Sequence, residues 1–164
     1  MKKRNDLRVA LHEAGHAVMH TFLRLDNLDA VSIEPRGTSG GRIEVRYSLF
    51  IQLAGTMTAG DPQLNELVRH DARLKLRNHI FVTLAGGEAE LLTPRVKRPR
   101  DKSDFDNHLV PIFDALFSTQ KDWERISYLE ELFRLRVRRL VRGILRQPIK
   151  EFAETLLQRR EIEG

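Results

Sequence analysis

Residues 11–18 read LHEAGHAV, and this stretch decides how the rest of the chain is interpreted. Apolar residues recur through it and on both sides of it at steps of three and four, which is the spacing of one helix face. They are Leu7, Leu11, Ala14, Val18 and Phe22. We expect a helix from about Asn5 to Leu25. Because residues four apart lie on the same side of a helix, His12 and His16 should be neighbours, with Glu13 beside them.

The composition limits the chemistry in which these side chains can take part. The chain has 164 residues, of which 41% are hydrophobic and 31% charged, and this suits one folded domain. It has no cysteine, which excludes disulfides, thiolate nucleophiles, iron–sulfur clusters and cysteine-bound zinc. Any bound metal must therefore be held by His, Asp or Glu. The formal net charge of +5 permits an acidic partner without requiring one.

Two histidines four residues apart on a helix are typical of a zinc site. Zinc accepts neutral imidazole nitrogens, and a catalytic site has three protein ligands and a water molecule. Glu13 is placed to accept a proton from that water as the general base of peptide hydrolysis. Gly15 costs about 1 kcal/mol relative to alanine inside a helix, which indicates that another part of the chain approaches this face. The alternative, two surface histidines on an amphipathic helix, is disfavoured because His12 and His16 flank the apolar stripe.

The residues alone leave the third metal ligand open. His20 lies about 12 Å along the helix from His12, too far for one ion to bind both. The remaining candidates are histidines and carboxylates of the later segments: His70, His79, His108, Glu90, Asp104 and Asp106.

The later segments predict further helices and one small sheet. Residues 30–35 and 42–47 alternate between apolar and polar side chains around a glycine-rich turn, which is typical of two strands. The second strand is either a sheet edge, to which an extended substrate could add, or an ordinary hairpin strand, which the sequence slightly favours. Helical periodicity returns over 64–93 and 104–118, and the rest of the chain predicts two helices with Pro148 in the first turn of the second. The expected fold class is α+β, predominantly helical, with a small β-sheet after the first helix.

Four motifs resemble the peptidase domain of the FtsH-type zinc metalloproteases. They are ALHEAGHAV at 10–18, VSIEPRG at 31–37, LAGGEAELL at 84–92 and SDFDN at 103–107. The resemblance implies a zincin-like metallopeptidase domain that binds Zn²⁺ through His12 and His16. It also implies a third ligand in the last motif, where Asp104 is the best match and Asp106 the alternative. Glu90 matches an acid of the third motif and could orient a zinc-bound histidine by accepting its other ring N–H, or could instead cap or salt-bridge a helix end.

The chain also departs from this family. Full-length members carry a membrane anchor and an AAA ATPase module, whereas no Gly-x-x-x-x-Gly-Lys-Ser/Thr phosphate loop is found in this sequence. We therefore expect an ATP-independent zinc metalloendopeptidase that hydrolyses peptide bonds of proteins or flexible polypeptides. The resemblance further implies a homo-oligomeric ring.

We expect one domain over 1–164, with a catalytic core over 1–118 and C-terminal helices over 119–164. His12, Glu13 and His16 interrupt what would be the apolar core of a signal peptide. No stretch approaches the ~18–20 apolar residues that cross a bilayer. The sequence therefore predicts no membrane span and a cytoplasmic protein.

The arginine-rich stretch RLRVRRLVRGILR at 134–146 supports the main alternative function. A basic amphipathic helix can bind nucleic-acid phosphates, so the chain could be a non-catalytic binding module that contacts nucleic acid or a protein partner. However, the segment 121–164 contains 11 basic and 8 acidic residues, so much of its charge can be paired internally. Phe133 is its only phenylalanine near the arginines, whereas single-stranded nucleic acid is commonly bound by several aromatic side chains. We therefore expect a solvated helix face and no nucleic-acid binding.

Overall fold

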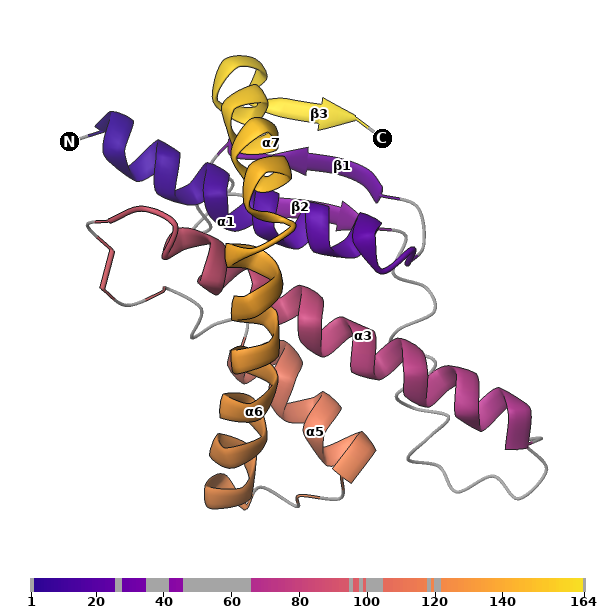
Figure 1. Ribbon diagram of the computed structural model, residues 1–164. Coiled ribbons are helices and arrows are strands. Elements are labelled where there is room, and N and C mark those ends of the chain that lie inside the picture. Colours follow the sequence, from indigo (N-terminus) through magenta and orange to yellow (C-terminus); the bar gives the residue numbers. More distant parts are fainter. Residues whose placement is uncertain are drawn as a thin grey trace.

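The computed structural model shows an α+β fold that is predominantly helical (Figure 1). It describes residues 2–25, 28–34, 42–45, 66–94, 96–97, 99, 105–117, 119 and 122–163. The elements in chain order are α1 (Lys2–Phe22), β1 (Leu28–Ser32), β2 (Arg42–Val45), α3 (Glu66–Glu90), the π-helix η1 (Phe105–Leu109), α5 (Val110–Phe117), α6 (Trp123–Arg142), α7 (Arg146–Arg159) and β3 (Glu161–Glu163). The predicted fold class is confirmed at this level.

Helix α1 packs on α3 through a glycine. A Cβ atom built at Gly15 would lie 2.7 Å from Cβ of Ala89, which is far inside normal van der Waals contact. The approach that the sequence predicted at Gly15 is therefore made by α3. The buried face of α1 is formed largely by small residues, and Ala10 and Ala14 are fully buried. Such side chains let two helix backbones come close together.

The prediction that the apolar stripe of α1 is buried along its whole length is wrong at the two ends. Leu7 is 37% exposed and Phe22 is 45% exposed, because the face turned towards α3 is centred on the alanines instead. The helix also ends at Phe22, earlier than predicted. Arg24 adopts a left-handed backbone with φ of 52°, and the Leu25 N–H donates to the His20 carbonyl, which closes the helix.

Three helix pairs make most of the contacts between the described helices. α3 packs against both α1 and α6, and α7 packs across α1. In Figure 1, α7 and α6 follow one another in a single column that runs across α1 and α3. The two predicted C-terminal helices are confirmed, with Pro148 in the first turn of α7. Asp122 caps α6 by accepting the Arg125 N–H at 3.2 Å.

Within the described residues the sheet has three antiparallel strands, in the order β2-β1-β3. Val31 of β1 pairs with Ile43 on one side and with Ile162 on the other. The sequence predicted β1 and β2 but not β3, which is three residues long and lacks the alternation of a longer strand. Among the described strands, β2 lies at an edge of the sheet, one of the two positions that the sequence left open. In the part of the chain that the structure describes, no helix has the length and hydropathy needed to cross a membrane.

Candidate metal centre

The two histidines of α1 meet at their outer ring nitrogens. His12 Nε2 lies 3.0 Å from His16 Nε2, and the ring planes are nearly perpendicular at 84°. The predicted neighbourhood of the two imidazoles follows from their spacing of four residues on one helix. The orientation of each ring is fixed by what its other nitrogen, Nδ1, contacts.

Those other nitrogens face groups from α3 that can only accept hydrogen bonds. His12 Nδ1 lies 2.9 Å from Glu90 Oε1, and His16 Nδ1 lies 2.7 Å from the Val82 carbonyl oxygen. Each Nδ1 must therefore carry the hydrogen and donate it. In the neutral rings this leaves a lone pair on both Nε2 atoms, which lie 3.0 Å apart.

Two lone pairs at this separation repel each other unless a proton or a metal ion is shared between them. Two nitrogens bound to one tetrahedral zinc ion at about 2.0–2.1 Å lie roughly 3.3 Å apart, which is close to the separation of the two Nε2 atoms. Neutral imidazoles whose second N–H is held by a carboxylate or a carbonyl are the ligands that zinc takes in proteins. The donor set of His12 and His16 therefore fits a zinc ion.

Glu90 links His12 to a charged residue, Arg8. Its side chain is only 3% exposed, and besides accepting from His12 it forms an ion pair with Arg8. Burial raises the pKa of the Glu90 carboxyl, but the hydrogen bonds from His12 and Arg8 and the positive charge of Arg8 outweigh burial and hold the pKa below its ordinary value. The carboxylate therefore stays ionised and holds His12 in one tautomer.

A second glycine makes room for the imidazoles. A Cβ atom built at Gly86 of α3 would lie 2.6 Å from Cε1 of His16, so only glycine leaves space for the ring here. Val82, whose carbonyl accepts from the same ring, lies one helical turn earlier. One face of α3 therefore both orients His16 and leaves the space in which its ring lies.

Glu13, the predicted base, follows His12 directly on α1, and its side chain is buried at 7% exposure. Asp104 and the side chain of Asp106 lie outside the described residues, so neither prediction of a third ligand is tested. Within the described residues, no group of three or more His, Asp or Glu side chains could hold a metal ion. His70 and His108, candidates from the sequence, are exposed.

Sequence reasoning missed Arg8 and the Val82 carbonyl. Arg8 lies four residues before His12, so the same helical spacing could have placed it on the metal-facing side of α1. No local signal marks Val82, because its role depends on where α3 crosses α1.

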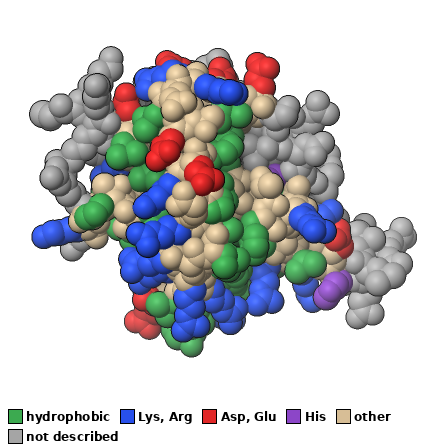
Figure 2. Space-filling view, turned by 45° about the horizontal axis from the view of Figure 1, so that its top comes forward, with side chains coloured by type: hydrophobic (Ala, Val, Ile, Leu, Met, Phe, Trp, Pro, Cys, Tyr) green, Lys and Arg blue, Asp and Glu red, His purple; other side chains and the backbone are tan. Residues whose placement is uncertain are grey.

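The arginine-rich stretch is partly neutralised within the chain. Glu88 of α3 is fully buried and accepts from Arg138 Nε at 2.9 Å and from Arg138 Nη2 at 3.1 Å. Arg134 is paired with Glu130 of its own helix and lies 3.5 Å from Glu88. Figure 2 shows Lys and Arg side chains gathered over the lower half of one face, where α6 lies. Internal pairing therefore uses part of the charge on which the binding-module alternative depends.

The chain resembles a known metalloprotease over nearly its whole length. No protein-family model matches it. ATP-dependent zinc metalloprotease FtsH of Borreliella burgdorferi (strain ZS7) is 27% identical in an alignment 167 residues long, which covers 96% of this chain. The chain spans 25% of that protein's length. This similarity indicates a distant relationship to a zinc metalloprotease.

Proposed function

We propose that this chain is a zinc-dependent metalloendopeptidase that acts without ATP on proteins or flexible polypeptides. The observation that carries the proposal is the convergence of the two Nε2 atoms 3.0 Å apart while both Nδ1 atoms face hydrogen-bond acceptors. A pair of surface histidines would not need a buried carboxylate and a backbone carbonyl to fix its tautomers. The distant similarity to a zinc metalloprotease supports the same function.

In the proposed site, His12 and His16 hold zinc, with Asp104 as the third ligand and Asp106 as the alternative. Zinc, when bound, supplies an acidified water molecule and polarises the peptide carbonyl. Glu13 accepts the proton of the attacking water and passes it to the leaving amine. Glu90 positions the His12 ring, because it fixes the hydrogen on Nδ1.

We assign a zincin-like metallopeptidase domain to 1–164, with the catalytic core over 1–118 and C-terminal helices over 119–164. β2 lies at an edge of the sheet among the described strands, and an extended polypeptide substrate can add to such an edge through main-chain hydrogen bonds. We further propose a homo-oligomeric ring in the cytoplasm, in line with the family resemblance.

The test compares metal content and proteolysis in wild type and Glu13→Gln. The proposal expects about one zinc per chain in both proteins and cleavage of an unfolded protein by wild type alone. Glu154→Gln, a change at an exposed site on α7, is the matched control and should keep both properties. Zinc-free wild type, or cleavage that survives in Glu13→Gln, would contradict the proposal. Zinc-free protein that binds nucleic acid with steep salt dependence would instead favour the binding module.

The third ligand needs a separate pair of variants. Asp104→Asn should lower zinc affinity, whereas Asp106→Asn should leave it unchanged. The opposite result would move the assignment to Asp106 without affecting the function proposed for the site.

A further inference from the structure

A candidate ligand site lies on the N-terminal half of α3, away from the candidate metal centre. A cavity of about 560 Å³ opens between α3, α5 and α6, within the roughly 300–1,000 Å³ typical of ligand sites. Its lining combines apolar side chains with arginines: Leu116, Phe117, Leu129, Leu132, Phe133, Arg73, Arg77 and Arg136. Arg77 and Glu90 are 13 residues apart on one helix, or about 20 Å, so this cavity is distinct from the candidate metal centre.

The apolar side of the cavity is preformed. Phe133 is 6% exposed, and its ring centroid lies 6.2 Å from that of Phe117 and 5.8 Å from that of Phe81. Packed aromatic rings of this kind hold their positions without a ligand. Leu132 borders the cavity and is 39% exposed, so an incoming apolar side chain can bury it further.

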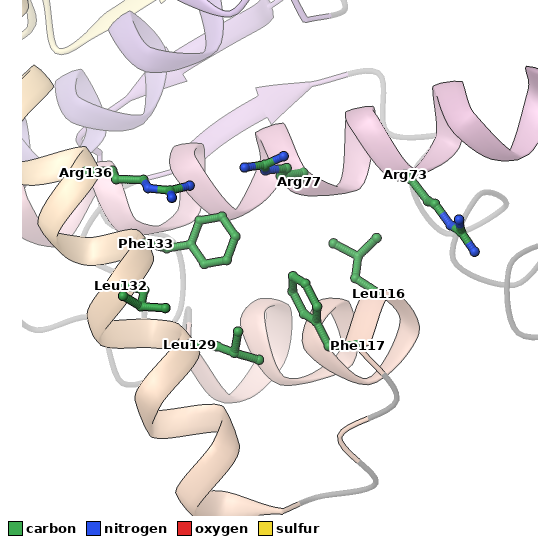
Figure 3. A pocket seen from close by; sticks show the side chains of 8 residues that line it. All are labelled: Arg73, Arg77, Leu116, Phe117, Leu129, Leu132, Phe133 and Arg136. Atoms are coloured by element: carbon green, nitrogen blue, oxygen red, sulfur yellow. The ribbon is translucent and has the colours of Figure 1, made fainter.

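The arginines line the opposite side. In Figure 3 the guanidinium groups of Arg136, Arg77 and Arg73 follow one another along the α3 side of the cavity, with the leucine and phenylalanine side chains facing them. All three residues are exposed. Among the residues that the structure describes, no carboxylate forms an ion pair with any of them. The guanidinium of Arg136 instead lies 6.0 Å from the centre of the Phe133 ring.

The arginines of α6 thus have two different surroundings. Arg134 and Arg138 are paired with the carboxylates of Glu88 and Glu130. Arg136, between them in sequence, points to the cavity. The cavity therefore has arginines without described acidic partners on one side and a preformed apolar surface on the other. This arrangement is complementary to a ligand that is acidic on one side and apolar on the other.

We propose that this cavity docks an acidic amphipathic segment of another polypeptide. One or two large apolar side chains of that segment enter the recess, and two or more carboxylates face the arginine row. Three cations spread over more than one helical turn match several carboxylates along a peptide better than the single head of a fatty acid. A flat anionic membrane is a poor fit, because apolar side chains recessed in a cavity cannot reach into it. This docking does not depend on the proposed peptidase activity.

The binding test uses the full chain and a fluorescent helical peptide with Leu and Phe on one face and Glu on the other. Fluorescence polarisation should show saturable binding that weakens with salt. A peptide with Gln in place of Glu, and one with Ser in place of Leu and Phe, should each bind about tenfold more weakly or worse. Failure of the acidic peptide to bind at about 1 mM overturns the proposal. So does equal binding of the Gln peptide.

Matched variants of the chain test the location. Arg77→Glu with Arg136→Glu should weaken binding about tenfold or more, whereas Arg125→Glu with Arg142→Glu, at exposed positions of α6 outside the cavity, should change it less than about twofold. Both double variants lower the net charge from +5 to +1, since each reversal changes it by 2. Equal weakening by both would show a diffuse charge effect and overturn the assignment.

A leucine pair on α6 tests the apolar half. Leu132→Ala should weaken binding about fivefold or more, while Leu135→Ala, outside the cavity and 44% exposed, should not. Circular dichroism checks that each variant keeps its helical content. Binding of anionic phospholipid vesicles that Leu132→Ala reduces, with no binding of the peptide, would replace the polypeptide partner with a lipid and overturn the proposal.

Discussion

Replacement of Glu88 by glutamine should destabilise the fold strongly. The Glu88 side chain is fully buried at the crossing of α3 and α6, and both of its oxygens accept hydrogen bonds from Arg138. Glutamine keeps the size of the side chain but presents an amide NH₂ group to a guanidinium. One buried donor then faces another donor, and the positive charge of Arg138 loses its partner.

The size of the destabilisation follows from how deeply Glu88, Arg138 and Arg134 are buried. Removing one partner of a buried ion pair costs about 3–5 kcal/mol. Arg138 is 34% exposed and Arg134 keeps its pair with Glu130, so the lower end of that range, about 3 kcal/mol, applies. For a chain of this size each kcal/mol lowers the melting temperature by about 2–4 °C, so Glu88→Gln should melt about 6–12 °C below wild type.

Urea denaturation followed by circular dichroism at neutral pH measures the loss. Glu154→Gln, at an exposed position of α7, should stay within about 0.5 kcal/mol of wild type. In an Arg138→Met background, Glu88→Gln should cost less, because the unpaired guanidinium is gone. If Glu88→Gln costs no more than Glu154→Gln, the ion pair does not hold α3 against α6 and the reasoning is refuted.

Three further changes test the crossing of α1 and α3. Gly15→Ala should destabilise by about 1–3 kcal/mol in urea, because its Cβ would lie 2.7 Å from Cβ of Ala89; a gain in stability would mean that the helices separate easily. Gly86→Ala should displace the His16 ring and lower zinc affinity, measured by competition with a chromophoric chelator, about 10–100-fold; unchanged affinity would contradict the role given to this glycine. The Glu90 pKa is held below its ordinary value, so the carboxylate stabilises the fold fully above about pH 4.3 and this contribution is lost as the pH falls through the folded-state pKa. The stability difference between wild type and Glu90→Gln in urea should therefore shrink below that pH, and a constant difference would argue against the ionised pair.

Features set by local periodicity were predictable from the sequence. The helices at α1, α3, α6 and α7 follow from apolar residues at helical spacing, and the pairing of His12 with His16 follows from a separation of four residues. The first two strands were predicted from alternation, although β1 begins and ends earlier than expected. β3 was not predicted, because a three-residue strand is defined by pairing with β1 and not by its own pattern.

The sequence by itself determined that two imidazoles lie side by side on a helix and that, without cysteine, only His, Asp and Glu could join them at a metal. It also indicated at Gly15 that another element comes close. Only the tertiary structure decided which groups fix those imidazoles, since Glu90 and Val82 lie 78 and 66 residues from their histidines. The same is true of the partition of the arginines on α6, where Glu88 neutralises Arg138 while Arg136 faces the cavity. The physical reason is common to both: these contacts depend on where α3 crosses α1 and α6, and a crossing is set by packing between distant segments, which local spacing does not encode.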